Sequence, residues 1–229
     1  MKKNLVILSG AGMSQESGIR TFRDMGGLWE EYDVMEVATP EAWARNPQLV
    51  MKFYNDRRRH LYDCVPNAGH VGLAELEKYF DVNIITQNID DLHERAGSSK
   101  VLHLHGELKK ARSSVDELLI YDIEGWELKF GDLCVMGSQL RPHIVWFGEA
   151  VPAMDEAIPV VENADILAVI GTSLNVYPAA GLVSYTKRGT PIFVIDPERP
   201  ELFIRNVTYI QEKAGKGVEI LKEQLIKEV

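Results

Sequence analysis

The glycine-rich stretch at residues 9–23 constrains the fold of this chain more than any other feature. It follows residues 5–8, Leu-Val-Ile-Leu, an apolar run that predicts a buried strand. Gly10 and Gly12 then allow a tight turn and a close approach of the backbone to a ligand. A helix that begins after such a turn directs N–H groups at an anion, for which a pyrophosphate is the usual occupant. The stretch therefore indicates either a phosphate-binding βα unit or an ordinary glycine-rich turn, since this pattern alone fits both.

The loop departs from the dinucleotide-binding fingerprint at its third glycine. Gln15 occupies the position where that fingerprint has glycine, and the next glycine is Gly18. The loop is therefore a longer variant, in which Phe22 and Arg23 are placed to fold over a bound molecule.

Other apolar runs along the chain predict a parallel sheet. These runs lie at residues 82–86, 101–104, 166–170 and 192–195. Runs of this kind that alternate with helical patterns are typical of parallel strands covered by helices on both faces. Ligands of such sheets bind beyond the carboxyl ends of the strands. We therefore expect one crevice built from the loops at residues 9–14, 87–90, 171–173 and 196–198.

We interpret residues 1–229 as a single domain with a small insertion. The Rossmann-like core is expected at approximately residues 1–25, 66–106 and 144–229. Between these segments, residues 26–65 carry helical patterns, and residues 107–143 carry turn signals and mixed polarity. The two intervening segments are expected to form a small, mainly helical module.

Charge and composition exclude several classes of function. The net charge of -9 argues against nucleic acid as a partner, because phosphate binding needs concentrated Lys and Arg. No window approaches the ~20 apolar residues of a membrane span, and the apolar run at the start is too short for a signal peptide. Cys64 and Cys134 give no disulfide framework. We therefore expect a cytoplasmic protein without membrane partners, and a monomer is our working expectation.

Five segments match, in order, the motifs of one family. They are Gly-Ala-Gly-Met-Ser-Gln-Glu-Ser-Gly-Ile-Arg-Thr-Phe-Arg at residues 10–23, Thr-Gln-Asn-Ile-Asp-Asp-Leu-His at 86–93, Leu-His-Gly-Glu at 104–107, Val-Trp-Phe-Gly-Glu at 145–149 and Gly-Thr-Ser-Leu at 171–174. With these segments the chain resembles the sirtuins, which are NAD-dependent protein lysine deacylases. The resemblance implies a Rossmann-like parallel sheet, NAD as co-substrate and acylated lysine side chains of proteins as partners.

The resemblance also implies a cofactor site that draws on several of these loops. That site would comprise Gly10, Ala11, Gly12, Ser14, Ile19, Phe22, Arg23, Gln87, Asn88, Ile89, Asp90, Gly171, Thr172, Ser173, Asp196 and Ala214. The glycine loop would hold the pyrophosphate, and Phe22 and Arg23 would cover the nicotinamide ribose. Asp90 would accept a hydrogen bond from the nicotinamide carboxamide. Asp196 stands where the family more often has asparagine, yet an acid there can still accept from a ribose hydroxyl.

His105 is the expected general base, with Asn88 as a second catalytic residue. A neutral imidazole is available near pH 7 to take a proton. In sirtuin chemistry the acyl oxygen attacks the sugar carbon as nicotinamide leaves, and a base then activates a ribose hydroxyl, which leads to 2′-O-acyl-ADP-ribose. His93 and His103 are the competing candidates for this base. The substrate peptide would pair with an extended edge that includes Val145, Phe147, Gly148 and Glu149.

The zinc site of most sirtuins is missing from this sequence. In the family two Cys-x-x-Cys pairs hold the metal, whereas residues 113–116 here are Ser-Ser-Val-Asp and residues 134–137 are Cys-Val-Met-Gly. One cysteine cannot close a tetrahedral zinc site. We therefore predict a module without zinc. It would be held instead by apolar packing of Leu118, Leu119, Ile120, Tyr121, Ile123, Trp126, Leu128, Phe130 and Leu133.

Tyr54 and Arg57 bear on the acyl group that is removed. They stand three apart in a predicted helix and so share a face. A guanidinium can grip a carboxylate with two charge-assisted hydrogen bonds. The pair resembles the Tyr-x-x-Arg of sirtuins that prefer succinyl-, malonyl- or glutaryl-lysine. The alternative is that residues 57–59, Arg-Arg-Arg, form a solvated basic face above a packed Tyr54.

We therefore predict an NAD-dependent desuccinylase and demalonylase of the bacterial, class III-like type, with weaker deacetylase activity. A protein ADP-ribosyltransferase and a non-catalytic NAD-sensing module are alternatives that the same scaffold leaves open. A hydride-transfer dehydrogenase fits less well, because the third glycine of the dinucleotide fingerprint is missing.

Overall fold

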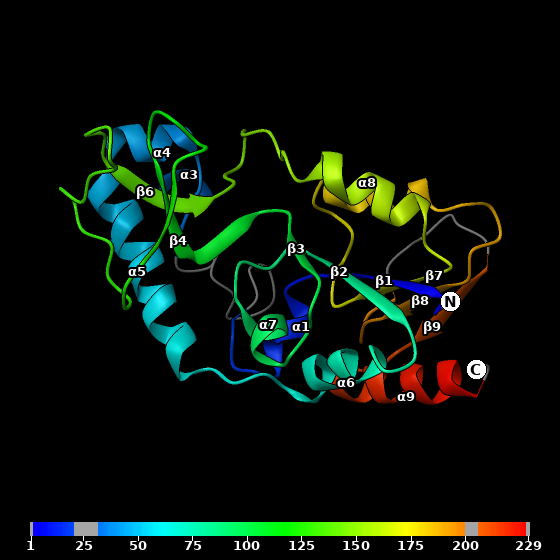
Figure 1. Ribbon diagram of the computed structural model, residues 1–229. Coiled ribbons are helices and arrows are strands. Elements are labelled where there is room, and N and C mark those ends of the chain that lie inside the picture. Colours follow the sequence, from blue (N-terminus) through cyan, green and yellow to red (C-terminus); the bar gives the residue numbers. More distant parts are fainter. Residues whose placement is uncertain (1, 21–31, 200–205, 228–229) are drawn as a thin grey trace.

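The computed structural model describes residues 2–20, 32–199 and 206–227. Its centre is a 6-stranded sheet with the strand order β3-β2-β1-β7-β8-β9 (Figure 1). The strands are β1 (Asn4–Ser9), β2 (Asp81–Thr86), β3 (Val101–His103), β7 (Ile166–Ile170), β8 (Ile192–Ile195) and β9 (Val207–Ile210). All neighbouring strands run parallel, which confirms the parallel sheet predicted from the apolar runs.

Helices cover both faces of this sheet. They are α6 (Ala68–Leu76) and α9 (Ala214–Ile226) on one face, and α8 (Met154–Glu162) and the 3-10 helix η1 (Ala179–Tyr185) on the other. Successive side chains of a strand point to opposite faces. Leu5 and Ile7 of β1 therefore pack with α6 and α9, whereas Val6 and Leu8 pack with α8 and η1. Figure 1 shows α6 and α9 below the sheet and α8 above it. The predicted Rossmann-like architecture is confirmed.

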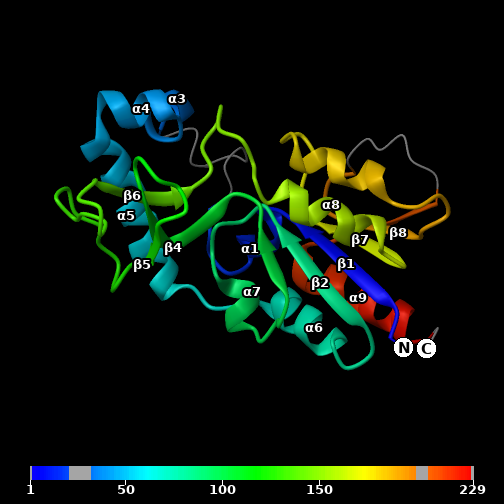
Figure 2. The ribbon, with the colours of Figure 1, turned by 45° about the horizontal axis from the view of Figure 1, so that its top comes forward.

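A smaller module lies beyond one end of this sheet, at the left of Figure 2, and is built from two parts of the chain. The first part contributes α3 (Val34–Val37), α4 (Pro40–Arg45) and α5 (Pro47–Asp63). The second contributes a 3-stranded antiparallel sheet in the order β5-β4-β6, made of β4 (Gly106–Ser113), β5 (Ile120–Asp122) and β6 (Leu140–Ile144). The module therefore combines the expected helices with a small sheet. This sheet was not predicted, because its strands are short and polar and leave no apolar run in the sequence.

The end of β6 belongs to this module and not to the large sheet. Ile144 and Trp146 pack against Phe53 and Tyr54 of α5 in a separate apolar cluster. The sequence places the return to the core at residue 144, whereas the chain leaves the module only after this cluster.

Apolar packing holds the module together through part of the expected set. Leu119, Tyr121, Ile123 and Leu128 pack around Met51 and Cys134. The expectation is wrong for the other members, which are exposed: Leu118, Ile120, Trp126, Phe130 and Leu133. Alternation along β5 explains part of this division, since Ile120 and Tyr121 point to opposite faces. In the described part of the chain, no three His, Cys, Asp or Glu side chains gather in a way that could hold a metal ion.

The helices of the described segments are also too short or too polar to span a lipid bilayer.

Candidate functional site

The loops at the carboxyl ends of the parallel strands open onto one cavity of about 900 Å³. The expected loops after β1, β2, β7 and β8 all contribute to its wall, and α5 and the segment after β6 close it from the side of the module. The wall brings together the predicted residues Gly10, Ala11, Gly12, Ser14, Ile19, Gln87, Asn88, Ile89, Asp90, His105, Gly171, Thr172, Ser173 and Asp196 with Tyr54, Arg57, Val145, Phe147, Gly148 and Glu149. Phe22 and Arg23, which were also predicted, lie outside the described residues.

Ala214 does not belong to this wall, although the sequence assigns it to the cofactor. It is buried at the start of α9, where the helix packs against α6. A Cβ on Gly69 of α6 would lie 3.1 Å from the Ala214 carbonyl oxygen. The preceding residue, Lys213, lines the cavity instead. The prediction was wrong here because the first residue of the helix already turns toward the core.

The two glycines after β1 have no room for a side chain, because the loop at residues 171–172 lies directly against them. A Cβ on Gly10 would lie 2.6 Å from the Thr172 Cβ, and one on Gly12 would lie 2.8 Å from the Gly171 Cα. Gly12 N donates to the Gly171 carbonyl at 2.9 Å. The helix that follows, α1 (Gly12–Gln15), is a single short turn. The glycines therefore allow the loop after β1 and the loop after β7, both candidates for phosphate binding, to lie in contact at the cavity wall.

A buried hydrogen-bonded chain joins Asn88, Ser14 and Asp90. Asn88 Nδ2 donates to Ser14 Oγ at 3.0 Å, and Ser14 Oγ donates to Asp90 Oδ2 at 2.9 Å. Burial raises the pKa of Asp90, while hydrogen bonds from the Leu92 N–H and from Ser14 oppose that rise. The carboxylate is thus an acceptor held in a fixed position on the cavity wall.

His105 is fixed in one tautomer on the same wall. Its Nδ1 lies 3.0 Å from the Gln87 carbonyl oxygen. Because a carbonyl can only accept, Nδ1 carries the proton and Nε2 of the neutral ring keeps its lone pair. Burial lowers the pKa of His105, and the bond to Gln87 only partly offsets this effect. The imidazole is therefore neutral near pH 7 and able to take a proton through Nε2.

The two competing histidines lie elsewhere. His103 has both ring nitrogens engaged, Nδ1 with the Asn88 carbonyl at 2.9 Å and Nε2 with Glu94 at 2.8 Å. His93 is 1% exposed, and its Nε2 lies 3.0 Å from Ser9 Oγ beneath the cavity floor. Of the three, His105 is the one that lines the cavity.

Tyr54 and Arg57 project from α5 onto the cavity wall. Tyr54 is 2% exposed, and Trp146 Nε1 donates to its hydroxyl at 3.1 Å. Burial raises the pKa of Tyr54 to about 12. Burial also lowers the pKa of Arg57, against the attraction of Tyr54 and Asp90. The guanidinium therefore lies in a partly desolvated position beside the phenol.

The alternative of a solvated basic face fails at Arg58. This residue is 0% exposed. Its guanidinium donates to the Leu108 carbonyl at 2.5 Å, to Asn55 Oδ1 at 2.7 Å and to the Trp126 carbonyl at 2.8 Å. The three arginines therefore have separate environments: Arg58 ties α5 to β4 and to the loop at Trp126, Arg57 faces the cavity and Arg59 is exposed.

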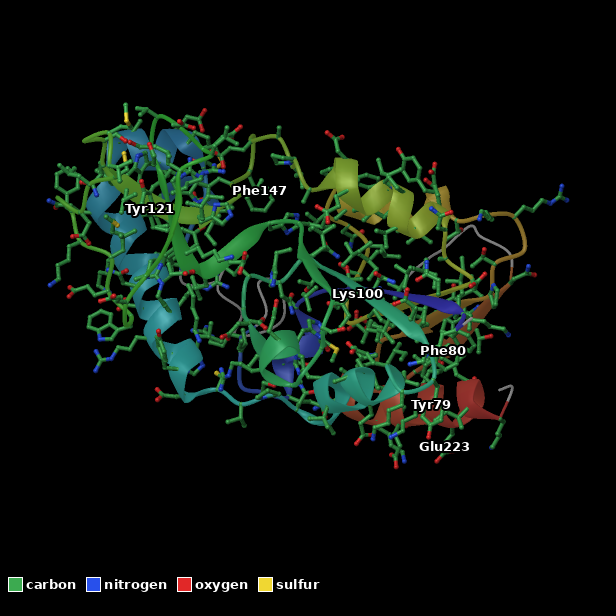
Figure 3. The ribbon with its side chains drawn as sticks, viewed as in Figure 1. Tyr79, Phe80, Lys100, Tyr121, Phe147 and Glu223 are labelled. Atoms are coloured by element: carbon green, nitrogen blue, oxygen red, sulfur yellow. The ribbon has the colours of Figure 1, made fainter. Side chains whose placement is uncertain are left out.

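The segment predicted as an extended edge, residues 145–149, turns back at residues 147–149. Val145 N donates to the His105 carbonyl at 2.9 Å, Phe147 N to the Ala38 carbonyl at 3.0 Å and Glu149 N to the Trp146 carbonyl at 3.0 Å. Gly148 has a φ of 90°, which favours glycine. These N–H groups are therefore engaged within the chain. Phe147 is 46% exposed and lies on the connection between the module and α8 (Figure 3).

Glu149, which was predicted to bind substrate, lines the cavity, but its carboxylate is held by two arginines. Arg141 donates to its carboxylate at 2.7 and 3.0 Å, and Arg112 donates at 3.1 and 3.2 Å. Burial would raise the pKa of Glu149, but the bonds from Arg141 and from the Trp146 N–H lower it below its ordinary value. This cluster ties the turn to β4 and β6.

Sequence reasoning missed several residues of the wall. Trp146 lies inside the matched segment 145–149, yet no role was assigned to it. His60 and Lys213 also line the cavity. His60 could have been found from its spacing, since it stands one turn after Arg57 on the same helix. Nothing in the sequence distinguishes Lys213 from other exposed lysines.

Comparisons with known proteins place the chain among similar sequences and structures. A family model described as the Sir2 family matches residues 10–178. A protein of Bacteroides thetaiotaomicron named NAD-dependent protein deacylase is 56% identical over 230 residues, which cover 98% of this chain and 98% of that protein. One of Helicobacter pylori strain 26695 with the same name is 56% identical over 225 residues, again covering 98% of each chain. A crystal structure of a Sir2 homolog–NAD complex matches with a TM-score of 0.88 and 41% identity, over 99% of this chain and 91% of that one.

Proposed function

The chain belongs to the Sir2 family, and we propose that it removes acidic acyl groups, above all succinyl and malonyl, from lysine side chains of proteins. Its near full-length relatives are named NAD-dependent protein deacylases, and the chain is an enzyme of this class. We further propose that acetyl groups are removed more slowly, and that the products are nicotinamide, 2′-O-acyl-ADP-ribose and the unmodified lysine. The observation that carries the acyl preference is the position of Tyr54 and Arg57 on the cavity that also holds His105.

The residues of the cavity fit NAD by their donors and by their size. A volume of about 900 Å³ lies within the range of ligand pockets of ~300–1,000 Å³. The wall offers hydroxyl groups on Ser14, Thr172 and Ser173 and a carboxylate on Asp196, which suit phosphate and ribose oxygens. When bound, NAD supplies a sugar carbon that becomes electrophilic as nicotinamide departs.

The chain's own residues would then orient the reactants and move one proton. Asp90 is a fixed acceptor for an amide N–H, and Asn88 is held beside it through Ser14. His105 Nε2 would take the proton of a ribose hydroxyl, because Nδ1 is already committed to Gln87. Positioned bases of this kind contribute about 10²–10⁴-fold to a reaction rate.

The acyl end would lie against α5. Arg57 can donate two parallel hydrogen bonds to a carboxylate, and Tyr54 can add a third. Hydrogen bonds to charged groups contribute about 1.5–3 kcal/mol, which corresponds to roughly 10–150-fold in affinity. An acetyl group has no such end, so it would enter the same cavity without these bonds. The exposed ring of Phe147 at the rim offers a surface for the flanking peptide.

A comparison of acyl groups on one peptide tests this proposal. The specificity constant is measured by nicotinamide release with acetyl-, malonyl- and succinyl-lysine in an identical sequence. We expect the two acidic groups to be preferred by at least about tenfold. Equal constants for acetyl and succinyl would remove the acyl preference, and transfer of label from NAD to the peptide itself would indicate an ADP-ribosyltransferase.

A further inference from the structure

The hydroxyl of Tyr54 is bound by a group that can only donate. Trp146 Nε1 lies 3.1 Å from the phenol oxygen, and both side chains are 2% exposed. An indole N–H has no acceptor capacity, so the phenol oxygen accepts this bond and the phenol proton must point elsewhere. Among the residues that the structure describes, none accepts that proton, and Tyr54 lines the cavity.

We propose that Trp146 is a positioning residue that determines acyl specificity, because its indole N–H orients the Tyr54 hydroxyl to donate into the acyl pocket. A donor fixed in this direction, beside the donors of Arg57, favours an acyl end that can only accept. A carboxylate is such a group. This inference rests on the proposed function, since it names the residue that sets the preference for acidic acyl groups.

The indole of Trp146 is held firmly enough to act in this way. Its ring lies 3.3 Å from the Arg141 guanidinium carbon, measured to the ring centroid, and 5.9 Å from the Trp43 ring. Its backbone N–H donates to Glu149 Oε2 at 2.8 Å, and Arg141 also binds the Glu149 carboxylate. The indole is therefore clamped between β6, α4 and the turn that follows β6.

The protonation of Tyr54 is consistent with a donor role. Burial raises its pKa to about 12, so the phenol keeps its proton at neutral pH. Arg57 draws the pKa in the other direction, although burial outweighs that attraction.

A double-mutant cycle tests the inference. Trp146→Phe removes the N–H while keeping an aromatic ring, and Tyr54→Phe removes the hydroxyl. Each single variant and the double variant are assayed for kcat and KM with succinyl-lysine peptide and with 4-methylpentanoyl-lysine peptide, a neutral group of the same shape. Trp126→Phe is the matched control, because it removes an indole N–H from a residue that does not line the cavity and makes no bond to Tyr54.

We expect Trp146→Phe to raise KM for the succinyl peptide by about five- to tenfold and to leave kcat and the neutral peptide within about twofold. In the Tyr54→Phe background the same change should alter KM by less than about twofold, since the residues act through one hydrogen bond. Additive effects of the two changes would overturn the inference, as would an equal rise for the neutral peptide.

Two further measurements separate other causes of failure. Replacement of Trp146 by 3-benzothienylalanine exchanges the N–H for sulfur at constant shape, so it repeats the test if the phenylalanine variant folds poorly. A wild-type enzyme with no preference for succinyl over the neutral peptide would defeat the proposed function and this inference together. A clear preference with additive variants would defeat only the role of Trp146.

Discussion

His105 Nδ1 lies 3.0 Å from the carbonyl oxygen of Gln87, so the imidazole is fixed with Nε2 unprotonated in its neutral form. The same Gln87 donates through Nε2 to Thr172 Oγ1 at 3.1 Å. Gln87 therefore links the end of β2 both to His105 and to the loop that follows β7. This arrangement makes the ionisation of His105 a direct probe of the proposed reaction.

We predict that the acid limb of the pH profile of kcat/KM lies below the ordinary histidine value of about 6.5. Burial lowers the pKa of His105, so the neutral form that acts as base persists to lower pH than in a free imidazole. The profile is measured with a succinyl peptide between about pH 5 and 8. A limb centred above about 7 would contradict the assignment, and His105→Ala should lower kcat by about 10²–10⁴-fold.

Arg57→Met should reduce the ratio of desuccinylation to deacetylation by about tenfold or more, because the carboxylate loses its charge-assisted bonds. The ratio is obtained from kcat/KM for the two peptides. Arg59→Met is the matched control, since Arg59 is an exposed neighbour in the same run and should leave the ratio unchanged. If both variants shift the ratio equally, the acyl preference would come from the general positive charge of this helix and not from binding of the carboxylate by Arg57.

Treatment with a metal chelator should change neither the activity nor the stability of the protein, because we predict that the module binds no zinc. Of the four cysteines of the family's zinc site only Cys134 is present, and the module packs Leu119, Tyr121 and Leu128 around it. Protein purified without chelator is analysed for zinc by mass spectrometry and then assayed with and without EDTA. Stoichiometric zinc, or a fall in melting temperature on chelation, would refute a module without metal.

Glu149 should make the free energy of unfolding fall as the pH is lowered. Its pKa is lowered in the folded state, so its contribution is complete above the unfolded value of about 4.5 and is lost as the pH falls through the folded value. Glu149→Gln removes the carboxylate that two buried guanidinium groups share and should cost about 3 kcal/mol at pH 7. Denaturant unfolding of both proteins between about pH 3 and 7 checks this. An unchanged acid dependence in the variant would show that other carboxylates carry it.

Much of the large sheet could be predicted from the sequence because parallel strands buried on both faces are apolar throughout. Residues 166–170 are an example, with every side chain in β7 buried. The loops of the cavity followed from the same reasoning, since the carboxyl ends of such strands share an edge. Local sequence and the overall fold agree in these places.

The module could not be predicted in the same way, because its strands depend on contacts between distant residues. Arg112 and Arg141 lie on neighbouring strands and meet at Glu149, a carboxylate that the motif alone assigns to substrate. Arg58 is buried only because carbonyls of Leu108 and Trp126 lie around it. Neither partnership leaves a periodic signal in the sequence.

The most direct test of the central claim is mass spectrometry of the products formed from NAD and an equimolar mixture of succinyl- and acetyl-lysine peptides. We predict that unmodified lysine peptide, nicotinamide and O-succinyl-ADP-ribose appear together, with O-acetyl-ADP-ribose accumulating more slowly, and that His105→Ala abolishes both acylated products. Hydrolysis to free succinate without an acylated ADP-ribose, or faster loss of acetyl than of succinyl, would contradict the account.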